Sequence, residues 1–499
     1  MRNDSIAVQP SSPTDISVAQ NLTHVKSRAF VFCRPYLISD FEENLVPLKD
    51  EFEFKFMTDG RRPGTDDTRK RFYERLEVAS PPSGFSHEDE LDVVARCRYL
   101  RNLPCNQALK MLRSMALVLE EELNLFEPHV VVAQMVDEYI THLLSKIAAI
   151  RGLMYVGYIY SYFPGRAQIV LFSDGRPLKI REPSESEIIE TWEQVSPRKF
   201  RQNYKQRNNY SKAQHLKSML RYKVKQVAFR LLAWRDNDPL NLHYRCLPYV
   251  VERRHWRDFP TESEFHQNWR ELLEKLPADK RKPVVYFPLA YFPESSTDYW
   301  VADKKILDYR NLTLNIFKSL RAEFTIIVKE HMHMLGGRSI DYYRAIMEID
   351  GVISVPPAVN SNEVLLVSEA VILGGGSVGI EAFIRGKPIL SFCNTSCWFS
   401  ASGAIEIDLA DIRHWPLKIR EAIRTHRPPS EANQLQFIKR CLQGTMRVRK
   451  SGRFWPICDP NDFRQLLRMT ASHPIPAIAC PSPGAPALKK LGLSAWIPG

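Results

Sequence analysis

The sequence predicts an α/β protein with two domains, each a parallel sheet covered by helices, and a cleft between them. Three observations support this prediction. The 499 residues exceed what one ordinary hydrophobic core accommodates. Short apolar runs alternate with helical patterns in both halves of the chain, which is typical of parallel sheets. A polar, basic stretch between the two halves interrupts this alternation.

These changes of pattern divide the chain into five expected segments. They are a disordered N-terminal lead over 1–25, a first α/β domain over 26–185, a basic helical insertion over 186–275, a second α/β domain over 276–430, and a C-terminal helix with a Pro-rich tail over 431–499.

The first domain contains a recognisable strand–helix–strand unit. Residues 28–33 and 128–134 are short apolar runs that predict buried strands. The pattern over 135–152 predicts a helix, and 153–161 predicts the next strand. A strand, a helix and a strand at this spacing form a βαβ unit, which requires a parallel sheet.

The second domain repeats the same alternation. Apolar runs at 283–289, 324–331, 351–356, 369–373 and 387–392 predict its strands, and helical patterns separate them. Open parallel sheets bind ligands at the carboxyl ends of their strands, so the candidate site is expected there.

The net charge of +12 is concentrated in one segment. Residues 196–235 hold twelve Lys/Arg and no Asp/Glu, so the rest of the chain holds 69 − 12 = 57 basic against 57 acidic residues. Six apolar residues recur within the segment every three or four positions and predict one apolar helix face: Leu216, Leu220, Val224, Val227, Leu231 and Trp234.

Three interpretations of this basic segment stay open. Its charges and its aromatic residues could bind nucleic acid, although no nucleic-acid-binding fold is recognised around it and no nucleic acid is expected. They could instead face an anionic membrane surface. The third interpretation is an inter-domain helix whose charges are simply solvated.

Other global features restrict the class of protein. No apolar run approaches the ~20 residues of a membrane-spanning helix, and the N-terminus has no apolar signal region. Nine cysteines without a C-x-x-C pair indicate neither a disulfide framework nor a zinc site. We expect a cytoplasmic protein, with peripheral association at the inner face of the cell membrane as an open alternative.

The stretch "AVILGGGSVGIEAF" (370–383) joins a predicted strand to a helix through glycines. Gly374, Gly376 and Gly379 match a dinucleotide fingerprint, but the turn comes late in its sheet and lacks the acid about 20 residues on. Gly375, Ser377 and Gly379 also match the G-x-S-x-G elbow of a serine hydrolase. Ser377 would then need partners among the later acids and histidines: Asp408, Asp411, His414 and His426.

A third interpretation makes the turn a cradle for an anion. Backbone amides at Gly375, Gly376, Ser377 and Val378 open a helix, whose N-terminus favours negative charge. The Ser377 hydroxyl adds a donor, and Glu381 could reach ribose hydroxyls. The alternative without a ligand is a tight strand-to-helix crossover that needs glycine only for packing.

Two nearby basic side chains favour the cradle. Lys329 and His331 end a predicted strand two elements earlier, and residues two apart share one face of a strand. They could neutralise a phosphate leaving group, although surface solvation is the commoner fate of such a pair. His331 and His333 have no third ligand at metal-site spacing, so no metal is expected.

Candidate acids for proton transfer lie in the first domain. Asp137 and Glu138 follow the strand at 128–134, where a carboxylate could deprotonate an acceptor hydroxyl. Both could equally begin a helix, whose dipole favours acids. Asp174 is a second candidate, but a hairpin turn at Asp174-Gly175 explains it well.

Residues 284–392 resemble the C-terminal half of capsule and surface-polysaccharide biosynthesis proteins, which are GT-B glycosyltransferases and include bacterial Kdo transferases. The motifs that carry the resemblance stand in the family's order: "YFPLAYFPESS" (286–296), Lys329-Glu330-His331, Gly337-Arg338 and "GSVGIEAFIRGKP" (376–388). One departure is Met332, which follows His331 where the family has proline.

The resemblance implies two Rossmann-like domains in the GT-B arrangement, with the acceptor in the first domain and the nucleotide sugar in the second. It implies a metal-independent transferase without a cofactor, whose donor is a CMP-, UDP- or GDP-linked sugar. The acceptor would be a polysaccharide or glycolipid. Two alternatives stay open: a serine hydrolase using Ser377, and a non-enzymatic glycan-binding or export partner with the same fold.

Overall fold

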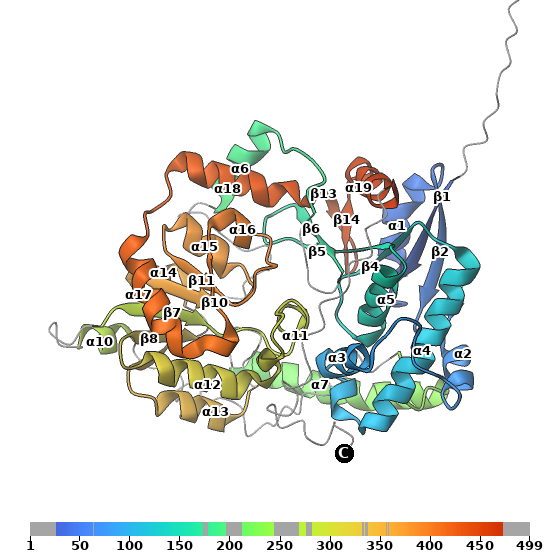
Figure 1. The fold of residues 1–499 in the computed structure, drawn as a ribbon, viewed down its shortest axis with the longest axis horizontal. Coiled ribbons are helices and arrows are strands. Elements are labelled where there is room, and N and C mark those ends of the chain that lie inside the picture. Colours follow the sequence, from blue (N-terminus) through green and yellow to red (C-terminus); the bar gives the residue numbers. More distant parts are fainter. Residues whose placement is uncertain are drawn as a thin grey trace, which may run out of the picture.

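The computed structural model describes residues 26–472 except for 63, 173–177, 196–211, 244–268, 276–281, 332–333, 335–337, 356 and 358. The expected lead over 1–25, Asp174-Gly175, His333, Gly337 and the tail beyond 472 lie outside the described residues, as does the first part of the basic segment. Two α/β domains stand side by side, one around each sheet (Figure 1).

The first domain is built on an eight-stranded sheet with the order β14-β13-β6-β5-β4-β1-β2-β3. Five neighbouring strands are parallel: β1 (Ser27–Phe32), β2 (Phe52–Thr58), β3 (Asp66–Asp67), β4 (Val130–Gln134) and β5 (Met154–Tyr160). β6 (Arg166–Leu171) runs antiparallel to β5. The expected strand–helix–strand unit is confirmed as β4, α5 (Tyr139–Ile150) and β5.

Alternating apolar residues bury both faces of this sheet. Phe30 and Val131 belong to the cluster that packs against α3 (His87–Arg96), α4 (Cys105–Phe126) and α5. Val31 and Val132 point to the opposite face, where α1 (Ile38–Leu45) and α19 (Pro460–Ser472) pack. Because side chains alternate along a strand, continuous apolar runs such as "VVVA" require helices on both faces.

The second domain is a six-stranded, wholly parallel sheet with the order β12-β11-β10-β7-β8-β9. Its strands are β7 (Val284–Pro288), β8 (Thr325–Lys329), β9 (Val352–Val355), β10 (Ala370–Leu373), β11 (Ile389–Ser391) and β12 (Ile405–Glu406). The surrounding helices are α11 (Ser295–Asp298), α12 (Tyr309–Leu320), α13 (Ile340–Met347), α14 (Ser361–Val367), α15 (Val378–Ile384), α16 (Phe399–Ser402) and α17 (Trp415–Thr425).

Read from β9 to β12, the strands follow the chain order 3-2-1-4-5-6, which is the doubly wound Rossmann order. The order reverses between β7 and β10. The first domain shows the same reversal between β1 and β4. The predicted fold class, two Rossmann-like α/β domains with parallel sheets, is therefore confirmed.

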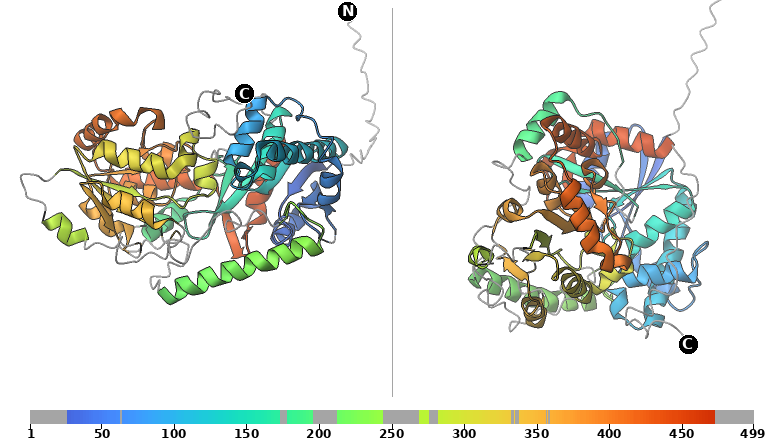
Figure 2. Two further views of the ribbon diagram at one scale, coloured as in Figure 1. Left: turned by 90° about the horizontal axis from the view of Figure 1, so that it is seen from below. Right: turned by 60° about the vertical axis from the view of Figure 1, so that its left-hand side comes forward.

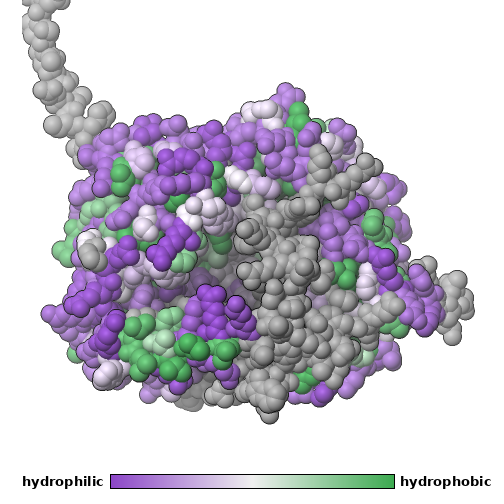
Figure 3. Space-filling view, turned by 180° about the vertical axis from the view of Figure 1, so that it is seen from behind, coloured by the Kyte–Doolittle hydropathy of each residue, from purple (hydrophilic) through white to green (hydrophobic). Residues whose placement is uncertain are grey.

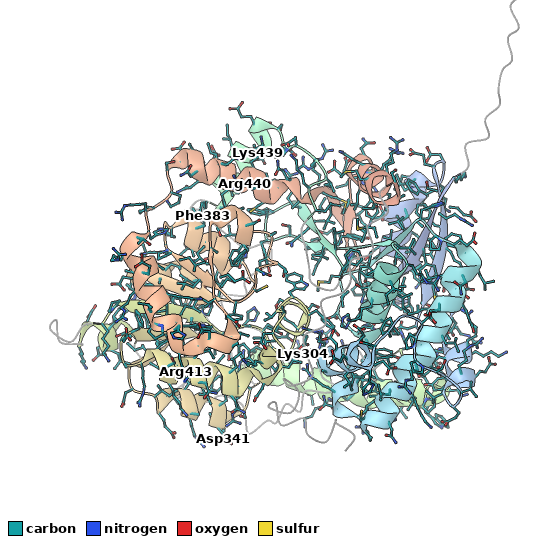
Figure 4. The ribbon with its side chains drawn as sticks, in the orientation of Figure 1. Lys304, Asp341, Phe383, Arg413, Lys439 and Arg440 are labelled. Atoms are coloured by element: carbon teal, nitrogen blue, oxygen red, sulfur yellow. The ribbon has the colours of Figure 1, made fainter. Side chains whose placement is uncertain are left out.

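The C-terminal segment crosses between the domains. α18 (Glu431–Gln443) packs against α6 (Glu185–Val195), and Phe437 stacks on Phe383 of α15 at 4.1 Å between ring centroids (Figure 4). The chain then returns to the first sheet as a hairpin, β13 (Thr445–Ser451) and β14 (Pro456–Cys458), and ends the described part with α19. The sequence analysis placed a helix in 431–499 but did not predict this hairpin.

The connection after β7 joins the two domains. Arg96 of α3 is buried and donates to three carbonyl oxygens of this connection, those of Asp298 (2.7 Å), Val301 (3.0 Å) and Ala302 (2.8 Å). Lys304 extends the joint through an ion pair of 3.1 Å with Asp92 (Figure 4). Tyr299 and Val301 share one apolar cluster with residues of the first domain.

The buried guanidinium of Arg96 gives a stability prediction. Replacing Arg96 with Met leaves three buried carbonyl oxygens without a donor, so we expect Arg96→Met to lower the free energy of unfolding by about 3 kcal/mol. Urea unfolding measures this change. The matched control is Arg424→Met, because Arg424 is exposed and its ion pair is with Glu421 of the same helix; we expect a change within about 0.5 kcal/mol. Equal effects of the two variants would contradict the proposed importance of the joint.

Candidate functional site

The glycines of the β10–α15 turn serve different physical purposes. A Cβ on Gly379 would lie 2.4 Å from the Trp398 ring, and a Cβ on Gly374 would lie 2.8 Å from the Phe392 ring. These two glycines are therefore needed for packing. Gly376 has a φ of +111°, which L side chains rarely adopt, and its carbonyl accepts a 2.8 Å hydrogen bond from the Trp398 indole. The G-x-G-x-x-G match is thus explained without a dinucleotide.

The turn lies where ligands of such sheets bind. It follows β10, which pairs with β7 at the point where the strand order reverses. A Cβ on Gly375 would lie 3.8 Å from the Cβ of Ser296 and 3.8 Å from the Trp300 ring. The turn therefore faces α11 and the connection that holds the two domains together.

Lys329 is the last residue of β8. In the sheet, β8 and β10 pair with β7 from opposite sides. Within the described part of the chain, its ammonium forms no hydrogen bond or ion pair, whereas its backbone carbonyl accepts from the amide of Leu289 at 2.9 Å. Burial lowers the pKa of Lys329, and the carboxylates of Glu381 and Glu330 act in the opposite direction. The structure thus brings Lys329 and Glu381, two of the predicted site residues, within electrostatic range of each other.

Glu381 is held in place by a hydrogen-bond network. It is buried in α15, and its Oε2 accepts a 3.1 Å hydrogen bond from the amide of Asn362. Arg385 donates in turn to Asn362 Oδ1 at 3.0 Å. This network fixes the orientation of the Glu381 carboxylate, which interacts electrostatically with the Lys329 ammonium.

His331 lies in the loop that follows β8. Its ring packs against Tyr291 at 5.5 Å between centroids, and its backbone N–H donates to Glu330. Glu330 is itself buried and paired with Arg338 at 2.7 Å. His331 is half-buried beside the connection after β7. The sequence predicted that His331 and Lys329 share one strand face, but β8 ends at Lys329, so His331 lies outside the strand.

Ser377 immediately precedes α15 in an ordinary right-handed conformation, with φ −69° and ψ −21°. Its carbonyl accepts from the amides of Ile380 and Glu381. Two candidate bases of a hydrolase have other partners. His426 contacts the carbonyl of Gly386, and His414 pairs with Asp411 on an exposed turn.

The two predicted acids of the first domain have different environments. Glu138 is buried as the N-cap of α5, accepting from the amides of Ile140 at 3.1 Å and Thr141 at 3.3 Å. Asp137 keeps 33% of its side chain exposed, pairs with Arg98 and accepts a 2.7 Å hydrogen bond from Ser295 of α11. Asp137 therefore reaches the second domain, whereas Glu138 caps a helix.

Sequence reasoning did not single out Glu294 as a site residue. It lies one residue before α11, in the Pro-Glu pair of the first motif, and accepts a hydrogen bond from Ser296. Desolvation raises the pKa of Glu294 to about 7, which the hydrogen bond from Ser296 and the charge of Arg98 partly oppose. The signal available in the sequence was the Pro-Glu pair itself.

No protein-family model matches the chain, and no curated protein matches it. Among solved structures, the chain is similar to Thermosulfurimonas dismutans KpsC, a beta Kdo 2,4 transferase (10% identity, TM-score 0.35, covering 90% of this chain and 99% of that chain). A Burkholderia vietnamiensis trehalose-phosphate synthase (10%, 0.28, 84% and 95%) and a Methanocaldococcus jannaschii UDP-GlcNAc 2-epimerase (11%, 0.26, 84% and 98%) are further examples.

The raised pKa of Glu294 gives a pH prediction. The folded state binds a proton more tightly than the unfolded state, so this contribution to stability is complete below about pH 4.5 and is lost as the pH rises through about 7. We expect Glu294→Gln, which stays neutral, to gain about 1–3 kcal/mol relative to the wild type between pH 5 and pH 8. Thermal unfolding across that range measures the difference, and a difference that does not change with pH would contradict the assignment.

Proposed function

We propose that this protein is a glycosyltransferase that binds a nucleotide sugar at the carboxyl edge of the second sheet. The acceptor is a hydroxyl of a capsular or other surface polysaccharide, or of its lipid-linked precursor. The observation that carries the proposal is Lys329, a largely buried cation beside the topological switch point of a Rossmann-like domain, whose ammonium forms no hydrogen bond or ion pair among the described residues. Such a cation is suited to a phosphate ligand.

Donor binding follows from the residues around the switch point. The Lys329 ammonium neutralises the phosphate of the leaving nucleotide, and the amides of Gly376, Ser377 and Val378 with the Ser377 hydroxyl supply further donors. Glu381 orients Lys329 and offers a carboxylate to the ribose. His331 contributes from the edge of the site beside Tyr291. In this proposal no metal ion is needed, because the cation and the amides carry the leaving-group charge.

The transfer step needs a base for the acceptor hydroxyl. We assign this role to Glu294, which precedes α11 and lies one hydrogen bond from Ser296, itself next to Gly375. The acceptor oxygen forms its bond to the anomeric carbon while its proton passes to Glu294 and the nucleotide leaves with the electron pair of the broken glycosidic bond. A carboxylate with a pKa near neutrality is suited to accept that proton.

Asp137 then takes a positioning role. Its carboxylate pairs with Arg98 and accepts a hydrogen bond from Ser295, and these contacts hold α11 against the first domain. Glu138 supports the same loop as the cap of α5. In this proposal the base is Glu294 of the second domain, whereas the sequence predicted Asp137 or Glu138 of the first domain.

A thermal-shift screen against CMP, UDP and GDP tests the donor site. We expect one nucleotide to raise the Tm of the wild type and Lys329→Ala to lose at least tenfold in affinity for it, because the phosphate loses its cation. Lys318→Ala is the matched control, since Lys318 is an exposed lysine of α12 in the same domain. If no nucleotide changes the Tm, the protein is a non-enzymatic partner and the proposal is wrong. Labelling of Ser377 by a fluorophosphonate would instead establish the hydrolase.

A second experiment tests the base, using the nucleotide sugar identified by the screen. We expect Glu294→Gln to lower the rate of transfer about 100-fold or more while leaving nucleotide affinity unchanged. Asp137→Asn should lower the rate less and should also lower the Tm, because it loosens α11. Equal and large losses of rate in Asp137→Asn without a change in Tm would return the base to Asp137.

A further inference from the structure

Helix α7 (Lys212–Arg235) carries an apolar stripe that the protein does not cover. Five side chains spaced four, three, four and three residues apart form the stripe, so all lie on one face of the helix. Their exposed fractions are 64% for Leu220, 61% for Val224, 59% for Val227, 61% for Leu231 and 83% for Trp234. The sequence predicted an apolar face here, and the structure places it in solvent.

α7 is held from its opposite side. Ala233 is buried, and Phe229 is half-buried. Just after the helix, the buried carboxylate of Asp238 accepts from Tyr73 of the first domain and from the amides of Leu242 (2.7 Å) and His243 (2.9 Å). Figure 2 shows the helix along the outside of the molecule, and Figure 3 shows a hydrophobic patch at the lower left of that side.

Basic side chains flank the stripe on both sides. With 3.6 residues per turn, Lys223 and Arg230 fall on one flank, and Lys217, Arg221 and Arg235 fall on the other. All five are exposed. No Asp or Glu occurs anywhere between 196 and 235. An uncovered apolar stripe between two basic rows is the arrangement of helices that lie in the plane of a membrane interface.

We propose that α7 docks this protein onto an anionic lipid surface, with the stripe among the acyl chains and the flanking cations at the headgroups. Long basic side chains can extend from an immersed helix to the headgroup level. At 24 residues the helix is about 36 Å long, enough for six turns of contact. No described helix is long and apolar enough to cross a membrane.

Charge decides between this occupant and the others. A second copy of the chain would place two basic rows against two basic rows, which repel. A nucleic acid would match the cations but leave Leu231 and Trp234 in water. An anionic bilayer satisfies both the stripe and its flanks. The inference uses no residue of the nucleotide site, so it stands or falls separately from the proposed function.

Flotation of the full-length protein with phosphatidylcholine vesicles, with and without 30% phosphatidylglycerol, tests the stripe. We expect binding only to the anionic vesicles, and at least a tenfold loss for the triple variant Leu220→Gln, Leu231→Gln, Trp234→Gln. The matched control is Val78→Gln, Leu125→Gln, Leu417→Gln, which replaces apolar residues exposed by 74%, 75% and 60% elsewhere on the molecule. All replaced side chains are exposed, so an unchanged Tm in both variants confirms that they fold.

The same assay tests the cations. Replacing Lys223 and Arg230 with Gln should weaken binding roughly fivefold for each residue, and 0.5 M salt should weaken wild-type binding further. Equal binding to neutral vesicles, or wild-type binding by the triple variant, would overturn the inference. So would light scattering that shows a dimer of the wild type but a monomer of the triple variant, because the stripe would then be a contact between copies.

Discussion

The polar joint between α3 and the connection after β7 determines where the rest of the site stands. Arg98 and Arg101 form ion pairs of 3.2 and 3.0 Å with the buried carboxylate of Asp298. Arg96 donates hydrogen bonds to three carbonyl oxygens of the same connection. Buried charges are costly unless paired, so these groups tolerate few alternative arrangements. The joint therefore fixes α11, and with it Glu294 and Ser296, relative to both sheets.

This constraint explains how a site can form from distant parts of the chain. The first sheet contributes Asp137 at the carboxyl end of β4, and the second sheet contributes the β10–α15 turn and Lys329. Among the described strands, no backbone pairing joins the sheet of the first domain to the sheet of the second. α11 fills the space between them, bonded to Asp137 on one side and adjacent to Gly375 on the other. A hydroxyl and a phosphate held at the two edges would meet at this short helix.

Patterns of local sequence predicted most of the fold and less of the site. Continuous apolar runs such as "VVVAQ" require a strand buried on both faces, which is why β4 and β5 were predicted. The β13–β14 hairpin was missed because "TMRVRKS" carries three basic residues, and it is a strand only through pairing with β6, more than 270 residues earlier in sequence. Glu294 was missed as an acid because its pKa depends on burial and on charges distant in sequence, such as Arg98, which no local pattern records.

The proposed phosphate site depends on the burial of the Lys329 ammonium. Burial lowers the pKa of this ammonium because the protein supplies less solvation than water, and Glu381 and Glu330 restore only part of what is lost. The two carboxylates are already engaged, one with Asn362 and the other with Arg338. In the proposed site, a phosphate at the switch point would pair with the Lys329 ammonium. There, part of the binding energy would come from relief of this desolvation cost, and it would be largest for a ligand that places its negative charge at Lys329.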